Sequence, residues 1–173
     1  MNSLLLAVIL TGFGKADITP PVGAFLPGYY QQRIATGADT PLELQCVAFS
    51  DGDNVGLVFS VDNLHLTQKT IAAAQGRLKA QYGVPPENTY IASTHIHTGA
   101  ATDTSYYINI LSESARQICD RYGETIEQRL VDAAAAAIRD LKPSTFAIAR
   151  TTCPGLSFIR RYLMKDGTVM TNP

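Results

Sequence analysis

The chain has 173 residues, of which 46% are hydrophobic and 17% are charged, and its formal net charge is −1. This composition is typical of one folded α/β domain and excludes an intrinsically disordered chain. Acidic and basic residues are interspersed, so the sequence offers no basic stripe for nucleic acid. It also lacks a run of the ~18 apolar residues that a membrane-spanning helix needs. We therefore expect a single domain over residues 1–173.

An apolar run, Leu4–Leu10, opens the chain and allows two interpretations. It has the length of a secretion-signal core, although no Lys or Arg precedes it. We prefer a first buried strand that leads into Lys15 and Asp17, and the compartment stays open. For Asp17 two roles are expected: a structural pair with Lys15, or a turn residue ahead of Pro20.

The next segments predict a loop, a hairpin and a helix. Residues 20–41 are rich in Gly and Pro and form the expected loop. Leu44–Phe49 and Val55–Val61 are predicted as two strands, because β-branched and aromatic residues flank a turn of Asp, Gly and Asn. Thr67 is expected to cap a helix that ends near Tyr82.

The second half of the chain predicts a strand, two helices and another strand. Thr89–Thr94 is a short apolar strand. Tyr106–Arg121 and Glu124–Leu141 are predicted as separate helices, and the alanines and apolar spacing of the second favour helix strongly. Thr145–Thr151 is predicted as the next strand. This order indicates an α/β fold with a mixed β-sheet covered by helices on at least one face.

Three cysteines, Cys46, Cys119 and Cys153, cannot all pair within one chain and show no metal-ligand spacing. We expect them to be buried free thiols that pack as small apolar side chains.

The most informative segment is His95-Ile96-His97, directly after the Thr89–Thr94 strand and before a Gly-containing loop. Residues two apart in an extended chain point to the same side, with Cα atoms about 6.5 Å apart. Two imidazoles so placed can converge on one divalent ion, and neutral His is a common zinc ligand. The alternative is one structural and one exposed histidine. Because α/β proteins usually place their sites at the carboxyl ends of strands, the pair favours a metal site.

Other protein families with an HxH metal site, and the serine hydrolases, fit the sequence less well. The Asp-His half of the metallo-β-lactamase pattern is missing after His97. Amidohydrolase barrels carry HxH on their first strand, whereas strands and a helix precede it here. Cupins need an all-β pattern. No G-x-S-x-G elbow of a serine hydrolase is present.

Several segments resemble, in order, the N-terminal part of the neutral/alkaline non-lysosomal ceramidase family. They are Gly14–Pro21, Gly28–Tyr29, Asp39–Leu42, Ser60–Leu64 and Ser93–Gly99, followed by Arg160–Tyr162 and Lys165–Gly167. The DITPP and THIHTG stretches are the most specific of these. The match is nearer to the shorter bacterial ceramidase-like proteins, and it implies the truncated front part of a larger ceramidase-like domain.

The resemblance implies a zinc-dependent hydrolase of amide bonds, acting on N-acylsphingosine or a related smaller amide. It makes His95 a zinc ligand and places His97 beside the same zinc ion, in contact with the reacting oxygen. The family's later ligands are a histidine, a glutamate and a tyrosine, but no histidine follows His97 here. Ala100 also stands where the family typically has proline. The alternative is therefore a truncated or degenerate, non-catalytic module of the same fold.

Further residues are candidates for roles around the pair. Asp62 and His65 follow a predicted strand, and we expect them to orient a ligand histidine. Arg160, Arg161 and Tyr29 are candidates for binding a small amide or lipid-like substrate. For each, an ordinary surface, capping or packing role is the alternative. At most one of the two adjacent arginines should face inward from a strand.

Overall fold

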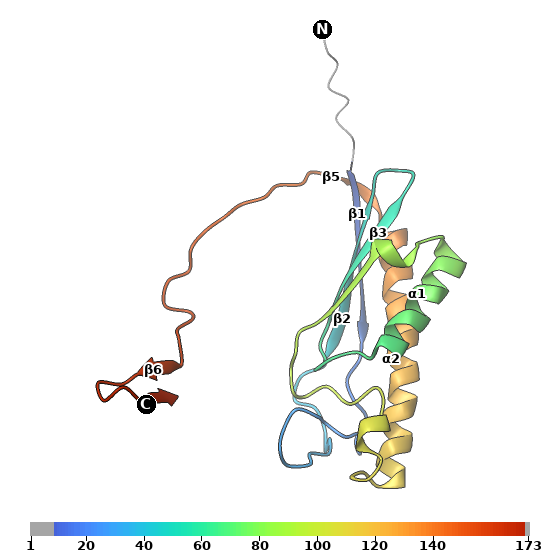
Figure 1. Ribbon diagram of the computed structural model, residues 1–173. Helices are drawn as coiled ribbons and strands as arrows, with labels where there is room; N and C mark the ends of the chain where they lie inside the picture. Colours follow the sequence, from blue (N-terminus) through green and yellow to red (C-terminus); the bar gives the residue numbers. More distant parts are fainter. Residues whose placement is uncertain (1–8, 172–173) are drawn as a thin grey trace.

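A five-stranded β-sheet with two helices on one face forms the body of the protein (Figure 1), in a computed structural model that describes residues 9–171. Its strand order is β4-β3-β2-β1-β5. The strands are β1 (Ile9–Asp17), β2 (Glu43–Ser50), β3 (Val55–Val61), β4 (Thr89–Ser93) and β5 (Lys142–Ser144). β3 and β4 run parallel and the other neighbours antiparallel. The predicted mixed sheet covered by helices is thereby confirmed.

The predicted hairpin and first helix are also confirmed. β2 and β3 pair along their whole length, and α1 (Gln68–Tyr82) follows. The Thr67 side chain accepts a hydrogen bond from the Thr70 N–H at 3.2 Å, which satisfies a free donor of the first turn. Gly83 ends the helix in the left-handed conformation, where its N–H reaches the Lys79 carbonyl. The short 3₁₀ helix η1 (Pro86–Asn88) then leads into β4.

The prediction of two later helices is wrong, because α2 (Glu113–Arg139) is one continuous helix of 27 residues. Ser112 caps it by accepting the Ala115 N–H at 3.2 Å. Upstream, the predicted helical start is only a 3₁₀ turn, η2 (Ser105–Tyr107). α2 continues through Gly123. The loop around Thr102 packs so closely against the helix here that a Cβ on Gly123 would lie 2.3 Å from the Thr102 carbonyl oxygen, so this position requires glycine.

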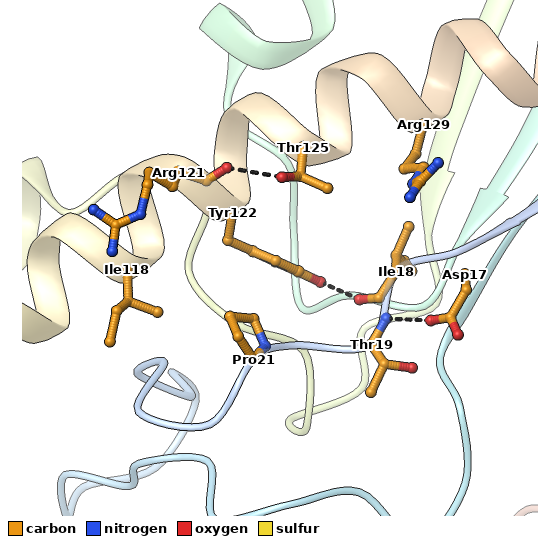
Figure 2. A pocket seen from close by; sticks show the side chains of 9 residues that line it. All are labelled: Asp17, Ile18, Thr19, Pro21, Ile118, Arg121, Tyr122, Thr125 and Arg129. Carbon is orange, nitrogen blue, oxygen red and sulfur yellow. Dashed lines mark hydrogen bonds between the residues drawn. The ribbon is translucent and has the colours of Figure 1, made fainter.

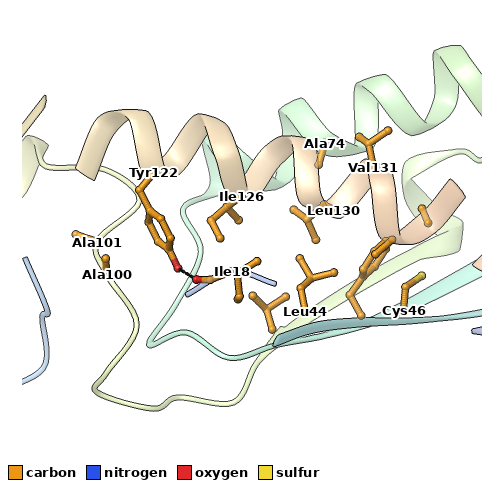
Figure 3. Packing of buried hydrophobic residues seen from close by; sticks show 14 of the residues in the cluster. Ile18, Leu44, Cys46, Ala74, Ala100, Ala101, Tyr122, Ile126, Leu130 and Val131 are labelled. Carbon is orange, nitrogen blue, oxygen red and sulfur yellow. Dashed lines mark hydrogen bonds between the residues drawn. The ribbon is translucent and has the colours of Figure 1, made fainter. Parts of the chain in front are cut away.

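The core lies between α2 and the covered face of the sheet. Figure 3 shows Tyr122, Ile126 and Leu130 pointing from α2 toward Ile18 and Leu44, and all of these side chains are buried. The helix also approaches β1 very closely, because β1 and the facing turns of α2 use glycine and alanine. A Cβ on either glycine of β1 in this contact would lie 2.1 Å from a helix carbonyl oxygen.

Two of the three cysteines follow the prediction. Cys46 and Cys119 are buried, and burial raises the pKa of Cys46 to about 12. Cys153 is exposed, so the expectation of a third buried thiol is wrong. Its segment leaves the body of the protein and has no core to enter.

The chain after β5 is an exposed arm. Every residue from 145 to 163 is exposed, and the arm ends in the small hairpin of β6 (Arg161–Leu163) and β7 (Val169–Thr171). The predicted strand Thr145–Thr151 is wrong: β5 ends at Ser144, where its pairing with the first residues of β1 stops. Figure 1 shows the arm curving away on the side opposite the helices.

The beginning of the chain is described only in part. Of the apolar run Leu4–Leu10, residues 4–8 lie outside the described residues, while the last two residues belong to β1. Asp17 takes the turn role, accepting the Thr19 N–H at 2.7 Å, and Lys15 pairs with Glu43 at 2.7 Å instead. Within residues 9–171, no helix combines the length and apolarity needed to cross a bilayer.

Candidate metal site

The histidine segment begins where β4 leaves the sheet. Pairing continues for two residues beyond β4: the Thr94 N–H donates to the Val61 carbonyl at 2.9 Å, and the His95 N–H to the Asn63 carbonyl at 3.0 Å. His95 has φ +63°, and it is the one non-glycine residue in the described chain with a positive φ. This conformation costs about 1–2 kcal/mol for an L-residue with a Cβ. Backbone strain of this kind clusters at functional sites.

A backbone carbonyl fixes the ring of His95. Its Nδ1 lies 3.0 Å from the Leu64 carbonyl oxygen, which can only accept, so Nδ1 carries the proton. The free lone pair is then on Nε2. Metal-binding histidines typically show this arrangement, because a hydrogen bond on one nitrogen sets the tautomer and orients the other.

The two imidazoles lie close enough to share a ligand. The ring centroids of His95 and His97 are 5.5 Å apart, with the planes at 78°. Two histidines on one tetrahedral zinc, with Zn–N bonds of about 2.0 Å, place their centroids roughly 5 Å apart. The pair therefore fits two adjacent positions of a zinc shell after a small adjustment.

The loop of residues 20–41 holds His97 in place. Tyr29 packs edge-on against its ring, with centroids 5.2 Å apart, and the Arg33 guanidinium lies 4.4 Å above the Tyr29 ring. Arg33 Nη1 also reaches the His97 carbonyl oxygen at 3.4 Å. Gly28 has φ +106°, and a Cβ there would lie 2.6 Å from His97 Nδ1. Two separate reasons therefore favour glycine at position 28: the positive φ of its backbone, and the lack of space for a Cβ beside the His97 ring.

Asn63 ties the two ends of the histidine loop together. It is 1% exposed, its carbonyl accepts the His95 N–H, and its Nδ2 donates to the Ala100 carbonyl at 3.1 Å. Gly99 packs against it, since a Cβ there would lie 2.9 Å from the Asn63 Cα. Sequence reasoning did not select Gly28 or Asn63 as site residues. The sequence did contain a signal for both, because Gly28 belongs to Gly28–Tyr29 and Asn63 to Ser60–Leu64, two of the segments that resemble the ceramidase family.

Asp62 and His65 lie next to this framework. Asp62 accepts the Glu43 N–H and the Thr94 hydroxyl, both at 3.2 Å, and so braces the residue before His95. His65 is exposed and follows Leu64, whose carbonyl holds His95. Neither side chain hydrogen-bonds to a ring of the pair among the contacts of residues 9–171. Their expected roles in orienting a ligand stay predictions.

Of the three residues predicted to bind substrate, only Tyr29 contacts the histidine pair. Tyr29 stands beside His97, whereas Arg160 and Arg161 are exposed, the first at the end of the arm and the second in β6, and no hydrogen bond, ion pair or ring contact of the described residues joins either of them to the pair. A hollow of about 340 Å³ is bordered by Arg33, Thr98 and the following part of the loop, and neither histidine of the pair lines it. Substrate binding by Tyr29, Arg160 and Arg161 stays a prediction.

A second hollow, of about 490 Å³, is lined by residues of the Asp17 turn and of α2 (Figure 2). It borders the Asp17 turn, and beneath it the Tyr122 hydroxyl donates to the Ile18 carbonyl at 2.6 Å. Burial raises the pKa of Tyr122, so the hydroxyl stays protonated and holds this turn to α2. This hollow does not include the histidine pair.

The pair alone does not make a full metal shell. In the described part of the chain, no group of three or more His, Cys, Asp or Glu side chains is placed to hold a metal ion. Zinc sites use three or four protein ligands. The arrangement thus supplies two adjacent nitrogen ligands and leaves the remaining positions open.

The fold is that of part of a neutral ceramidase. No protein-family model and no curated protein matches the sequence. The solved structures that match the fold include a ceramidase complexed with C2 and the neutral ceramidase from Pseudomonas aeruginosa, with TM-scores of 0.61 and 0.59 at 23% and 22% identity. Each match covers 79% of this chain but only 22% of the ceramidase. The chain therefore spans about a fifth of the length of these proteins.

Proposed function

We propose that this chain carries the front part of a zinc-dependent hydrolase of amide bonds, with His95 and His97 as two zinc ligands. The observation that carries the proposal is the backbone of His95, strained at φ +63°, with a ring held by the Leu64 carbonyl at 3.0 Å. A structural histidine needs neither feature. The positive φ and the hydrogen bond to Leu64 would together orient Nε2 of His95 toward a metal ion that His97 also binds.

The chemistry follows from the donor set. A zinc ion bound there would act as a Lewis acid toward an amide carbonyl and activate water near neutral pH. The Leu64 contact would orient the His95 Nε2 lone pair toward such an ion. His97, braced by Tyr29 and Gly28, would supply the second nitrogen ligand. The proposed substrate class is N-acylsphingosine or a smaller amide.

A second candidate is a non-catalytic module of the same fold. The specific observation in its favour is the ligand count, because only two metal ligands come together within residues 9–171. Two histidines leave an open and weakly held shell, whereas a catalytic zinc site has three protein ligands. Metal affinity and stoichiometry therefore separate the two candidates.

Zinc content and amide hydrolysis test the proposal together. We expect the purified wild type to retain zinc after dialysis, and His95→Ala and His97→Ala to lose it. The fourth protein is His65→Ala, which removes an exposed histidine close in sequence to the Leu64 contact: a lower zinc content would confirm its expected role in orienting a ligand, and an unchanged content would make it a surface residue. Equal zinc in all four proteins would refute the site. Zinc retention without hydrolysis of a fluorogenic N-acyl amide would favour the non-catalytic module.

A further inference from the structure

Part of the loop of residues 20–41 is a small hairpin whose tip touches His97. Residues 24–26 pair with residues 33–35 through an isolated bridge and two backbone hydrogen bonds, of 2.8 and 2.9 Å. Residues 27–32 form the tip, which includes Gly28 and Tyr29, the two residues beside the His97 ring. A ring held by the tip of a hairpin is placed only as precisely as the base of that hairpin is fixed.

Phe25 fixes this base in two directions. It faces Ile34 as a non-hydrogen-bonded pair, so the N–H and the carbonyl of Phe25 point away from the hairpin. The N–H donates to Cys119 Sγ of α2 at 3.2 Å, and the carbonyl accepts the Ala101 N–H at 3.0 Å. The Phe25 ring packs edge-on against Tyr107, with centroids 4.8 Å apart. The hairpin is thereby tied both to α2 and to the segment that follows His97.

The Cys119 thiol satisfies a backbone donor that has no water beside it. Phe25 is 6% exposed and Cys119 is 0% exposed. Burial raises the pKa of this thiol, although the Phe25 N–H acts in the opposite direction, so the sulfur accepts as a neutral group. A buried N–H that loses its acceptor is costly, and the chain around it shifts to find another. Cys119 therefore does more than fill space in the core.

Cys46 is the appropriate comparison within the same core. It is 1% exposed, and burial is the one cause of its raised pKa, with no hydrogen bond from a described residue acting on the thiol. Cys46 lies on β2 and packs as a small apolar side chain. The two buried cysteines thus differ in one respect that matters here, which is the hydrogen bond to the hairpin.

We propose that Cys119 is a positioning residue of the metal site: its sulfur fixes Phe25, Phe25 fixes the base of the hairpin, and the hairpin tip holds the His97 ring. The consequence for zinc binding rests on the proposed function, whereas the position of the ring can be measured without metal. His95 is held separately, by Leu64 and Asn63. Loss of the Cys119 sulfur should therefore move one ring of the pair and leave the other in place.

Imidazole NMR correlations of the full chain, recorded without added metal, test the positioning. We expect Cys119→Ala to shift the His97 signals and to leave those of His95 unchanged. Cys119→Ser restores an acceptor and should return the His97 signals toward their wild-type positions. Cys46→Ala removes the same thiol from the same core and should move neither ring. Cys119→Val, which fills the space but has no acceptor, should act like Cys119→Ala and decides the question if the alanine cavity prevents folding.

Zinc titration of the same proteins gives the second readout. We expect the affinity to fall about 3- to 10-fold in Cys119→Ala, at or below the lower range for residues that support a ligand, and to stay at the wild-type value in Cys46→Ala. Wild-type His97 signals in both Cys119→Ala and Cys119→Val would overturn the inference, as would an equal shift in Cys46→Ala. A wild type that binds no zinc refutes the proposed function instead, and the His97 signals still decide the role of Cys119.

Discussion

Replacing Gly28 with alanine tests how strictly the loop of residues 20–41 positions His97. The new Cβ would lie 2.6 Å from His97 Nδ1, whereas an ordinary contact needs at least about 3.4 Å. The imidazole therefore has to move by roughly 0.8 Å or the loop has to retreat. A zinc site requires its ligand distances within about 0.2 Å of ideal values. We expect zinc affinity to fall at least ~10-fold, the lower range for disturbed ligand support.

The matched control is Gly52→Ala. Gly52 has φ +102°, nearly the +106° of Gly28, but a Cβ there would meet nothing within 4 Å. Both variants should therefore lose about 1–2 kcal/mol of stability from the positive φ. For a chain of this length, that loss lowers the melting temperature by about 2–8 °C. Only Gly28→Ala carries the additional displacement of the His97 ring.

Zinc titration with a competing chromophoric chelator measures affinity, and imidazole NMR correlations report the rings without any metal. The sequence has only three histidines, so each imidazole signal can be assigned by substitution. We expect the His97 signal to shift in Gly28→Ala and all three to stay in place in Gly52→Ala. If the His97 ring and the zinc affinity are unchanged in Gly28→Ala, the packing argument is wrong. Equal zinc losses in both variants would assign the effect to stability instead.

Three other measurements follow from single contacts. His95→Asn should keep or raise the melting temperature, because Asn tolerates a positive φ, while zinc retention is lost; a large drop in stability would make the residue structural. Gly123→Ala should destabilise α2 through the 2.3 Å clash, whereas Gly76→Ala, with open space, should stabilise α1 by about 0.5–1 kcal/mol, both read by denaturant unfolding. At pH 8 iodoacetamide should label Cys153 alone, because a pKa raised to about 12 leaves roughly one Cys46 in ten thousand as thiolate; mass spectrometry would detect any other labelled thiol.

The first half of the fold could be predicted from the sequence because short-range features determine its turns and helix ends. The turn between β2 and β3 and the caps of α1, Thr67 and Gly83, are short-range features with their own hydrogen bonds. The strand before His95 is likewise set by its apolar run. These elements came out within a residue or two of their predicted bounds.

Tertiary packing decides the parts that the sequence alone did not predict. Gly123 lies between the two predicted helices, Tyr106–Arg121 and Glu124–Leu141, and a glycine inside a helix is locally unfavourable. The contact with Thr102 explains it, and that contact is not visible in a local window. The segment Thr145–Thr151 has the composition of a strand, but β-structure needs a partner, and the ladder ends at Ser144.

Of the candidate site, the sequence predicted the histidine pair but not most of the residues that hold it in place. The spacing of His95 and His97 and the motif around them indicated the pair. Their supports come from elsewhere: Arg33 contacts a carbonyl 64 positions away, and Asn63 reaches Ala100 across 37. Such contacts depend on how the loops fold over the end of the sheet, which periodicity and composition do not encode.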